Sequence, residues 1–332
     1  MKIALIGATG LVGRKILQVL EEQQLPLDSL ILVASERSLG KEIWFKNRPI
    51  KVVSMQTAID EKPDIAIFSA GAAVSLHHAP LFAEKGTRVI DNSSAWRKNQ
   101  EIPLIIPEIN ADVLKKSDRI IANPNCSTIG MLMAIAPLHR AIGIKRLVVS
   151  TYQSVSGSCT KGIEQFRKEQ KGEISLNPAY PHTIYGNVIP QGGDFCDNGY
   201  TTEEEKLVFE TRKILRAPQI AITATVVRVP VLVAHSLAVN IEFECAFDIE
   251  QIHELLHSMP GLVVCDDIAN KQYPMPLTAA DKDAVFVGRI RRDYSIENGL
   301  NMWVVADNLR KGAATNAVQI AKLLIDDVFF DR

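Results

Sequence analysis

The chain has 332 residues, which is enough for two domains of ordinary size. Its 37 Lys and Arg residues almost balance 38 Asp and Glu residues, so the net charge of −1 excludes the overall positive field that favours nucleic acid or an acidic membrane surface. The five cysteines form no Cys-x-x-Cys pair, which favours free thiols in a reducing cytoplasm over a zinc site or a disulfide framework, and no apolar run has the length of a transmembrane helix.

The first residues predict a dinucleotide-binding turn. Lys2–Ile6 is typical of a strand, Arg14–Leu20 has the pattern of an amphipathic helix, and the glycine-rich Gly7–Gly13 joins them. In this context glycines let the backbone approach a pyrophosphate, and the N–H groups at the helix N-terminus bind its negative charge. A P-loop is excluded because no Gly-Lys-Ser/Thr sequence closes the turn. The alternative is an ordinary strand-to-helix turn.

A second predicted strand, Leu30–Ala34, is followed by residues that bear on the choice of cofactor. Glu36 is placed to accept a hydrogen bond from a free ribose 2′-hydroxyl, which favours NAD. Arg37 and Ser38 instead suit a ribose 2′-phosphate, because they make charge-assisted bonds to it. A glutamate swings outward more easily than a phosphate loses its partners, so we expect NADP.

Strands and helices continue to alternate along the first half of the chain. Asp64–Ser69 and Arg88–Asp91 are predicted strands, with a helix near Val74–Glu84 between them. This alternation predicts a Rossmann-type α/β domain, whose doubly wound parallel sheet binds ligands at the carboxyl ends of its strands. Arg97 lies just beyond one such end and is a candidate for binding a substrate anion. The alternative is a solvated loop arginine.

Cys126 lies between a predicted strand, Arg119–Ala122, and a predicted helix, Ile129–Leu138. Pro124 forces a turn between them, because proline fits neither a helix interior nor a central strand. The unpaired N–H groups at a helix N-terminus stabilise a thiolate. Cys126 is therefore a candidate nucleophile, and the alternative is a small buried side chain.

The second half of the chain has a pattern typical of an α+β domain. Longer strands with longer connections indicate a mostly antiparallel sheet with helices on one face. The predicted strands are 146–155, 220–229, 238–247, 284–291 and 300–306, and the predicted helices are 163–170, 202–215 and 249–258. The Pro-, Gly- and Asn-rich segment 172–198 is predicted to be an ordered excursion that contacts substrate or a subunit. A final helix over 315–324 is expected to dock on the first domain.

Arg228 and His235 stand on either side of a predicted connection between two strands. Histidine has an ordinary pKa that suits proton transfer near neutral pH, so His235 is a candidate acid or base; the alternative is a loop histidine held by backbone. The other histidines, including the pair His77–His78, lack such a setting, and those near charged helical stretches are predicted to lie on the surface. A cysteine and a histidine on a nicotinamide-binding fold suggest chemistry through a thiohemiacetal and a thioester.

Seven motifs, in order along the chain, resemble those of the aspartate-semialdehyde dehydrogenases, and the resemblance covers essentially the whole sequence. They are Gly7-Ala8-Thr9-Gly10-x-x-Gly13, Asp91-Asn92-Ser93-Ser94-Ala95-x-Arg97, Asn123-Pro124-Asn125-Cys126-Ser127-Thr128, Thr151-Tyr152-Gln153-x-Val155-Ser156-Gly157, the acidic run ending in Lys206, Arg228 to His235, and Asp307-Asn308-Leu309-Arg310-Lys311-Gly312-Ala313-Ala314. Seven ordered matches are far more specific than any one of them. The chain departs from the family pattern at Leu237-Ala238, where many members carry a polar or acidic residue.

The resemblance implies a role for each matching residue. It makes Cys126 the acyl-thioester nucleophile, His235 the general acid/base and Gln153 the residue that orients the thiohemiacetal. The implied substrate contacts are Arg97, Asn125 and Lys206 to phosphate, Arg228 to the α-carboxylate and Glu203 to the α-amine. The implied cofactor contacts are Gly7, Thr9, Gly10, Leu11, Val12, Gly13, Arg37, Ser38, Ser156, Gly157 and Asn308.

The resemblance also implies an activity and an assembly. The activity is the NADPH-dependent reductive dephosphorylation of L-aspartyl-4-phosphate to L-aspartate-4-semialdehyde, a step of lysine, threonine and methionine biosynthesis. The assembly is a homodimer or a dimer of dimers. Residues 1–125 are expected to form the NADP-binding domain with a C-terminal helix over 308–332 packed on it, and residues 126–307 the catalytic and dimerisation domain.

Two other functions are compatible with much of this pattern. A related reductase of N-acetylglutamyl phosphate or glyceraldehyde phosphate shares the cysteine chemistry, but an acylated amine has no need of Glu203. The second is a non-catalytic nucleotide-binding paralogue. The presence of Cys126, Gln153 and His235 together argues against it.

Overall fold

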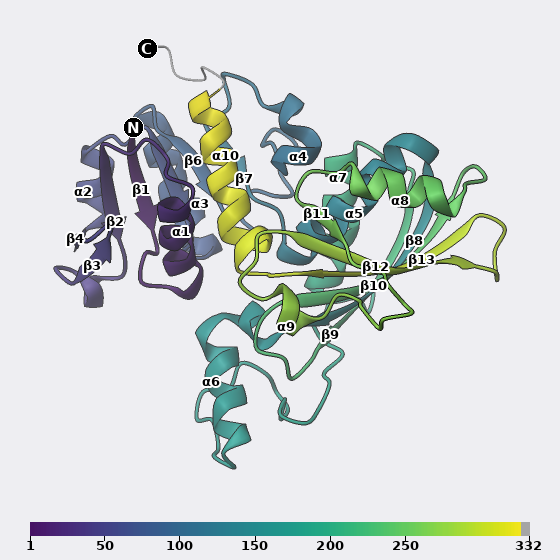
Figure 1. The fold of residues 1–332 in the computed structure, drawn as a ribbon. Helices are drawn as coiled ribbons and strands as arrows, with labels where there is room; N and C mark the ends of the chain where they lie inside the picture. Colours follow the sequence, from purple (N-terminus) through teal and green to yellow (C-terminus); the bar gives the residue numbers. More distant parts are fainter. Residues whose placement is uncertain (327–332) are drawn as a thin grey trace. The chain divides into compact units, whose positions relative to one another are not determined.

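A computed structural model describes residues 1–326 of the chain, and Figure 1 shows its course. The described chain divides into two compact units. The first contains Met1–Asn125 together with the residues from Ala313 onward, and the second is Cys126–Gly312. The second boundary therefore falls after Gly312 and not after residue 307.

The first unit is built on a seven-stranded sheet in the order β3-β4-β2-β1-β5-β6-β7. Every strand pair in it is parallel except β3 with β4. Its strands are β1 (Lys2–Ile6), β2 (Ser29–Val33), β3 (Glu42–Phe45), β4 (Arg48–Val53), β5 (Ile65–Phe68), β6 (Arg88–Asp91) and β7 (Ile120–Ala122), and its helices include α1 (Leu11–Glu22), α2 (Met55–Asp60), α3 (Ala72–Glu84) and α4 (Pro107–Asn110). The predicted Rossmann-type α/β fold is confirmed.

The helix α10 (Thr315–Asp326) belongs to this first unit, where it packs against α1 and α4. Its apolar face is fully buried in the same core cluster as β1 and α1. The helix predicted over 308–332 begins later than that prediction, at Thr315, because Arg310–Ala314 form a π-helical turn before it. Residues 327–332 of that prediction lie outside the described residues.

The hairpin of β3 and β4 was not predicted from the sequence. Its two-residue turn is Lys46-Asn47, and both residues have positive φ angles, of 46° and 60°. This is the geometry of a type I′ turn, for which Asn-Gly is the usual signal. Pro49 also weakens the strand signal, and proline is tolerated at this position of β4 because β4 pairs with β2 only further along, at Val52 and Val53.

The second unit is built on a six-stranded sheet in the order β11-β12-β13-β10-β8-β9. The three central pairs are antiparallel, whereas β8 with β9 and β11 with β12 are parallel. The helix α5 packs on β8, β10, β12 and β13, and α7 and α8 lie beside it on the same face (Figure 1). The elements are α5 (Cys126–Ile142), β8 (Ile144–Gln153), α6 (Cys159–Gln170), α7 (Thr202–Leu215), β9 (Ala221–Arg228), β10 (His235–Phe243), α8 (Ile249–His257), β11 (Leu262–Val264), α9 (Pro276–Ala279), β12 (Val285–Asp293) and β13 (Gly299–Ala306).

The strand β10 begins earlier than predicted. His235 is its first residue and pairs with Ala306 of β13, so His235 is part of the sheet and not of a connection between strands. The alternation of side chains already starts at the histidine, while the true connection from β9 is the short segment 229–234. A position in a paired strand fixes the backbone of His235 more firmly than a loop does.

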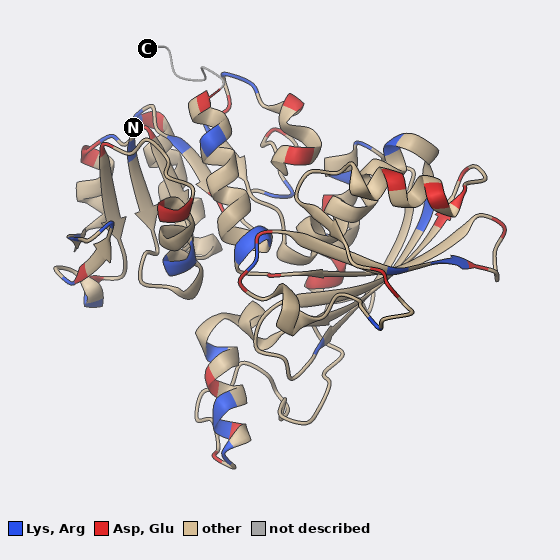
Figure 2. Ribbon diagram, in the orientation of Figure 1, with Lys and Arg blue, Asp and Glu red and all other residues tan. Residues whose placement is uncertain are grey.

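Charges of both signs occur along the helices and strands of each unit (Figure 2), and their totals nearly cancel to a net charge of −1. The helix α6 shows this pattern most plainly, with basic and acidic residues following one another along it. Within residues 1–326, no helix combines the length and the apolar character needed to cross a membrane.

Candidate active site

The glycine turn after β1 has the shape that a dinucleotide requires. Gly7 has a φ of +91°, and a Cβ there would overlap the carbonyl oxygen of Ser69. A Cβ on Gly13 would overlap the carbonyl oxygen of Gly7. Helix α1 starts after Gly10 without a side-chain cap and without an acidic residue in its first turn. Its N-terminal N–H groups are therefore suited to the pyrophosphate of a nicotinamide nucleotide.

A pocket of the first unit opens beside this turn. Its lining includes Gly7, Thr9 and Gly10 and continues along the end of β2 through Ser35, Glu36 and Leu39. Arg37 is exposed and Ser38 is buried, and neither of them lines the pocket. Glu36, Arg37 and Ser38 were the three residues predicted to contact the ribose. Of these, Glu36 is the one that lines the pocket.

Two histidines of α3 line the same pocket, where His77 is exposed and His78 is half-buried. The rings of His77 and His78 lie 4.5 Å apart, edge to face. Burial and the neighbouring His77 lower the pKa of His78 below its ordinary value. Val74, His78 and Leu81 share one face of α3 by helical spacing and all line the pocket, so this spacing was the signal in the sequence.

The two predicted phosphate-binding residues of the first unit are both buried. Arg97 is 6% exposed and donates from Nη2 to the carbonyl oxygen of Asn92 at 2.8 Å. This burial excludes the solvated loop arginine. Asn125 is 7% exposed and is the last residue before α5.

The predicted site residues Gln153, Arg228, His235 and Asn308 of the second unit lie at one edge of its sheet. Gln153 ends β8 and pairs with Arg228, which ends the parallel strand β9. His235 starts β10, which runs antiparallel to β8, so it lies at the same edge. The strand β13 ends there too, and Asn308 follows it. Sheet topology thus brings together residues that are far apart in the sequence.

Cys126 is the first residue of α5 and lies beside this edge. The amide Nε2 of Gln153 donates to Oγ of the adjacent Ser127 at 2.9 Å. On the other side, the backbone of Gly312 is so close that a Cβ there would lie 2.8 Å from the Cβ of Cys126. The thiol is therefore held at a helix N-terminus, between the end of β8 and the last residue of the unit.

We expect that Gly312→Ala displaces the thiol and lowers kcat by about 10²-fold, the cost of misplacing a reacting atom by roughly 1 Å. The reason is that the new methyl group meets Cβ and Cα of Cys126 at 2.8 and 3.3 Å. Nucleotide affinity, measured by fluorescence titration, is expected to stay the same. An unchanged kcat would show that the thiol tolerates this displacement.

Arg228 is a buried cation, only 7% exposed. No acidic side chain of the described residues forms an ion pair with it. A Cβ on the exposed residue Gly157 would lie 2.5 Å from its Nη1 and 3.1 Å from Nε2 of His235. The guanidinium and the imidazole therefore face one small space. A buried charge is costly without a partner, so this space suits an anionic ligand.

His235 is 1% exposed, and only one of its two ring nitrogens has a hydrogen-bond partner among the described residues. Its Nδ1 accepts the backbone N–H of Ser154 at 3.0 Å, and Nε2 is buried without a partner among the described residues. Burial, with a smaller effect of the nearby Arg228, lowers the pKa of His235 to about 3. The ring is neutral near pH 7. The hydrogen-bond partner of the ring is Ser154, next to the end of β8. The apolar Leu237-Ala238 therefore do not remove the hydrogen bond that holds His235.

This burial makes stability depend on pH. The pKa of His235 is about 3 in the folded protein and 6.5 as the ordinary value, so between these values the unfolded chain binds more protons. The stability from a neutral ring is complete above pH 6.5 and is lost as the pH falls. At about pH 4.5 the wild type is expected to have lost roughly 2 to 3 kcal/mol more unfolding free energy than His235→Gln. Urea unfolding of both proteins across the pH range measures this difference in unfolding free energy. If the unfolding free energies of the two proteins changed with pH in the same way, the prediction would be contradicted.

The three consecutive glutamates in the first turn of α7 have different surroundings. Glu203 forms an ion pair with Lys206, one turn further along the helix. The carboxylate of Glu204 accepts the backbone N–H groups of Thr201 and Val226, at 2.6 and 2.9 Å, so it fixes α7 to β9. Glu205 accepts from Asn198 at the surface. Glu203 is half-buried beside Lys206, and of the three glutamates it is the one whose setting is compatible with the predicted binding role.

Comparisons with known proteins cover almost the whole chain. Residues 2–117 match the family model described as semialdehyde dehydrogenase, NAD binding domain, and residues 135–311 match the one described as semialdehyde dehydrogenase, dimerisation domain. The aspartate-semialdehyde dehydrogenase of Aquifex aeolicus is 48% identical over 98% of both chains, and aspartate-semialdehyde dehydrogenase 2 of Vibrio cholerae is 45% identical over 98% of both. The crystal structure of aspartate semialdehyde dehydrogenase II from Vibrio cholerae complexed with ASA has a TM-score of 0.94 at 44% identity, again over 98% of both chains. The chain belongs to the aspartate-semialdehyde dehydrogenase family.

Proposed function

We propose that the protein reduces L-aspartyl-4-phosphate to L-aspartate-4-semialdehyde, with Cys126 as the nucleophile. The observation that carries the proposal is the buried guanidinium of Arg228, which has no acidic partner among residues 1–326. It lies beside His235, at the sheet edge where Gln153 reaches the start of α5. A fixed cation at this place suits the α-carboxylate of an amino-acid substrate. The names of the relatives support the same substrate.

Each side chain then has a defined task. Cys126 attacks the acyl carbon and carries the thioester, Gln153 orients the reacting carbon, and His235 acts on the carbonyl oxygen. Glu203 faces the α-amine, and Lys206 binds phosphate. In the first unit, Arg97 and Asn125 are assigned to phosphate as well, and the burial of both supports a binding role. The bound nicotinamide nucleotide supplies the hydride.

The test is phosphate-dependent reduction of NADP and of NAD by aspartate semialdehyde, followed at the absorbance of the reduced nicotinamide. The proposal requires turnover that depends on phosphate. Activity only with N-acetylglutamate semialdehyde would instead assign the chain to the related acyl-phosphate reductases. Nucleotide binding without turnover of either aldehyde would favour the non-catalytic paralogue.

The cofactor part of the proposal is NADP, held at the glycine turn, with Arg37 and Ser38 at the 2′-phosphate. Arg37 is exposed and free to turn toward a phosphate, whereas Glu36 is the residue at the pocket. The proposed contacts from the second unit are Ser156, Gly157 and Asn308.

Arg37→Ala is expected to lower kcat/KM for NADP by about 10- to 100-fold, because it removes a charge-assisted hydrogen bond to phosphate. The value for NAD is expected to stay within about 3-fold, since NAD has no group for Arg37 to bind. Steady-state assays with both nucleotides measure the two values. Equal losses for NAD and NADP would place Arg37 in a structural role.

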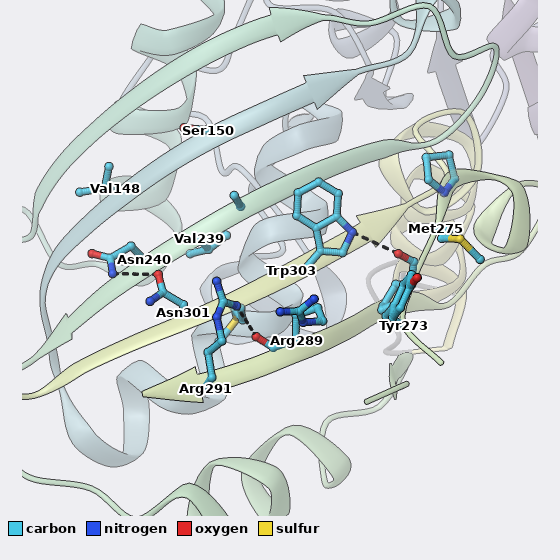
Figure 3. Close-up of a pocket in the computed structure, with 14 residues that line it drawn as sticks. Val148, Ser150, Val239, Asn240, Tyr273, Met275, Arg289, Arg291, Asn301 and Trp303 are labelled. Carbon is cyan, nitrogen blue, oxygen red and sulfur yellow. Dashed lines mark hydrogen bonds between the residues drawn. The ribbon is translucent and has the colours of Figure 1, made fainter. Parts of the chain in front are cut away.

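The proposal includes a homodimer, formed through the face of the second unit's sheet that α5 leaves open. A groove on this face is lined by Tyr273, Met275, Arg289, Arg291, Asn301 and Trp303 (Figure 3). The groove lies within the part of the chain that matches the family's dimerisation domain. None of the five cysteines, all of which lie in the described part of the chain, forms a disulfide bond, which supports the proposed cytoplasmic setting.

A further inference from the structure

The side-chain amide of Asn92 is buried, and neither of its polar atoms has a hydrogen-bond partner among the described residues. It therefore offers one free donor, Nδ2, and one free acceptor, Oδ1. Buried polar groups in folded proteins are almost always paired, because an unpaired group loses its bonds to water without replacement. An exception of this kind points to a ligand that supplies the missing partners.

The backbone of Asn92 is fixed on both sides. Its N–H donates to the carbonyl oxygen of Phe68 at 3.0 Å, so Asn92 still pairs with β5 although β6 ends at Asp91. Its carbonyl oxygen accepts from Nη2 of Arg97 at 2.8 Å. A side chain on such a backbone keeps its place at the carboxyl edge of the sheet.

The alternation along β6 decides which face of the sheet carries the amide. Val89 packs in the cluster that contains residues of α2 and α3, whereas Ile90 packs in the cluster that contains residues of α1 and α10. Successive side chains of a strand point to opposite faces, so Asn92 lies on the face of Ile90. This face is the one that α1 covers, and the N-terminus of α1 is suited to the pyrophosphate.

The strand order places Asn92 in the half of the sheet that suits the nicotinamide. The order β4-β2-β1-β5-β6-β7 corresponds to two mononucleotide-binding halves, which meet between β1 and β5. The half of β1, β2 and β4 carries Glu36 at the pocket, the position that takes the adenosine ribose in such folds. The nicotinamide then belongs to the half of β5, β6 and β7, and Asn92 follows its middle strand. Asn125, the last residue before the proposed nucleophile, comes after the outer strand β7.

We propose that Asn92 binds the carboxamide of the nicotinamide ring. The carboxamide carries an NH2 donor and a carbonyl acceptor, which match Oδ1 and Nδ2 of the asparagine in a pair of hydrogen bonds. Phosphate matches less well, because its negative charge would lie against Oδ1. The inference rests on the part of the proposed function that concerns the nicotinamide cofactor, which the match to the family's NAD binding domain supports. It does not depend on the aldehyde or on the choice between NAD and NADP.

Asn92→Leu is expected to weaken nucleotide binding without weakening the fold. Leucine has a similar volume and no polar atoms, so the unliganded variant should unfold at the same or a higher urea concentration than wild type. In calorimetric titrations its affinity for NAD and for NADP should fall about 10- to 100-fold, the scale for losing two neutral hydrogen bonds. Unchanged affinities would overturn the proposal, and so would a lower urea midpoint, which would give the amide a structural role.

A nucleotide without the nicotinamide separates a contact with the ring from a change of the whole site. ADP-ribose and its 2′-phosphate share the adenosine and the pyrophosphate of NAD and NADP but lack the ring. Their affinities should stay within about 2-fold of wild type in Asn92→Leu, because groups without shared partners act independently. This result also shows that the nucleotide-binding unit is folded. Equal losses with and without the ring would contradict a contact between Asn92 and the carboxamide.

An altered ring tests the hydrogen bonds themselves. In 3-acetylpyridine adenine dinucleotide a methyl group replaces the NH2 of the carboxamide, so the donor to Oδ1 is lost. The wild type should bind this nucleotide about 5- to 10-fold more weakly than NAD, and Asn92→Leu should bind the two alike. A preference for NAD that survives in Asn92→Leu would assign the carboxamide to another residue.

Asn99→Leu is the matched control. Asn99 lies in the same connection after β6, but its amide is exposed, and its Oδ1 accepts the backbone N–H of Glu101 at 2.9 Å. The substitution should change none of these affinities by more than about 2-fold. No aldehyde is added in any of the titrations, so they give the same answer whether or not the protein turns over aspartate semialdehyde.

Discussion

Cys126→Ala is expected to reduce phosphate-dependent turnover of aspartate semialdehyde by at least about 10⁴-fold, because no other group replaces a lost nucleophile. The substitution removes only the sulfur at the first position of α5, where the helix leaves N–H groups without intrahelical partners. Nucleotide affinity is expected to remain, since the glycine turn belongs to the other unit. Rapid-quench and steady-state assays measure the loss.

Cys245→Ala is the matched control for this experiment. Cys245 is exposed and lies in the connection after β10, away from the sheet edge with His235. Its substitution is expected to leave kcat within about 2-fold of wild type, as surface changes usually do. If Cys126→Ala kept substantial activity, the acyl-enzyme mechanism would fail and the nucleotide-binding paralogue would become the better interpretation.

Arg228→Met is expected to have opposite effects on activity and on stability. Loss of the guanidinium should lower kcat/KM for aspartate semialdehyde by about 10² to 10⁴, the range for removing one partner of a buried charged pair. The unliganded protein should unfold at the same or a higher urea concentration, because Arg228 is 7% exposed and has no acidic partner among the described residues. Urea unfolding and steady-state kinetics on the same preparation measure both effects.

Two comparisons identify the group that Arg228 binds. Arg228→Lys retains the charge but not the two-pronged geometry, so its activity should lie between wild type and Arg228→Met. Propionaldehyde, which lacks the α-carboxylate, should be turned over equally slowly by wild type and Arg228→Met. A loss of the same size with propionaldehyde would mean that Arg228 acts on the reacting centre and not on the carboxylate.

The sequence predicted the framework of both units but not how the side chains of the site are held. β1, α1 and the helix at Cys126 follow from hydrophobic periodicity and from glycine and proline positions, which are local signals. The turn of Lys46-Asn47 was missed because its positive φ angles are uncommon for these residues. The pocket position of His78 and the bond from Ser154 to His235 were missed because they depend on which segments meet in space, and the second of these joins residues 81 positions apart.

The ends of the second unit suggest how such enzymes are assembled and exchanged. Cys126 and Gly312 are its first and last residues, and they are in contact. A domain whose two ends lie close together can be inserted into another chain without an added linker. Recombination at these two points would combine the second unit of one relative with the nucleotide-binding unit of another. Cys126, His235 and Arg228 would then be transferred together. One of the two junctions thus lies at Cys126, the proposed nucleophile.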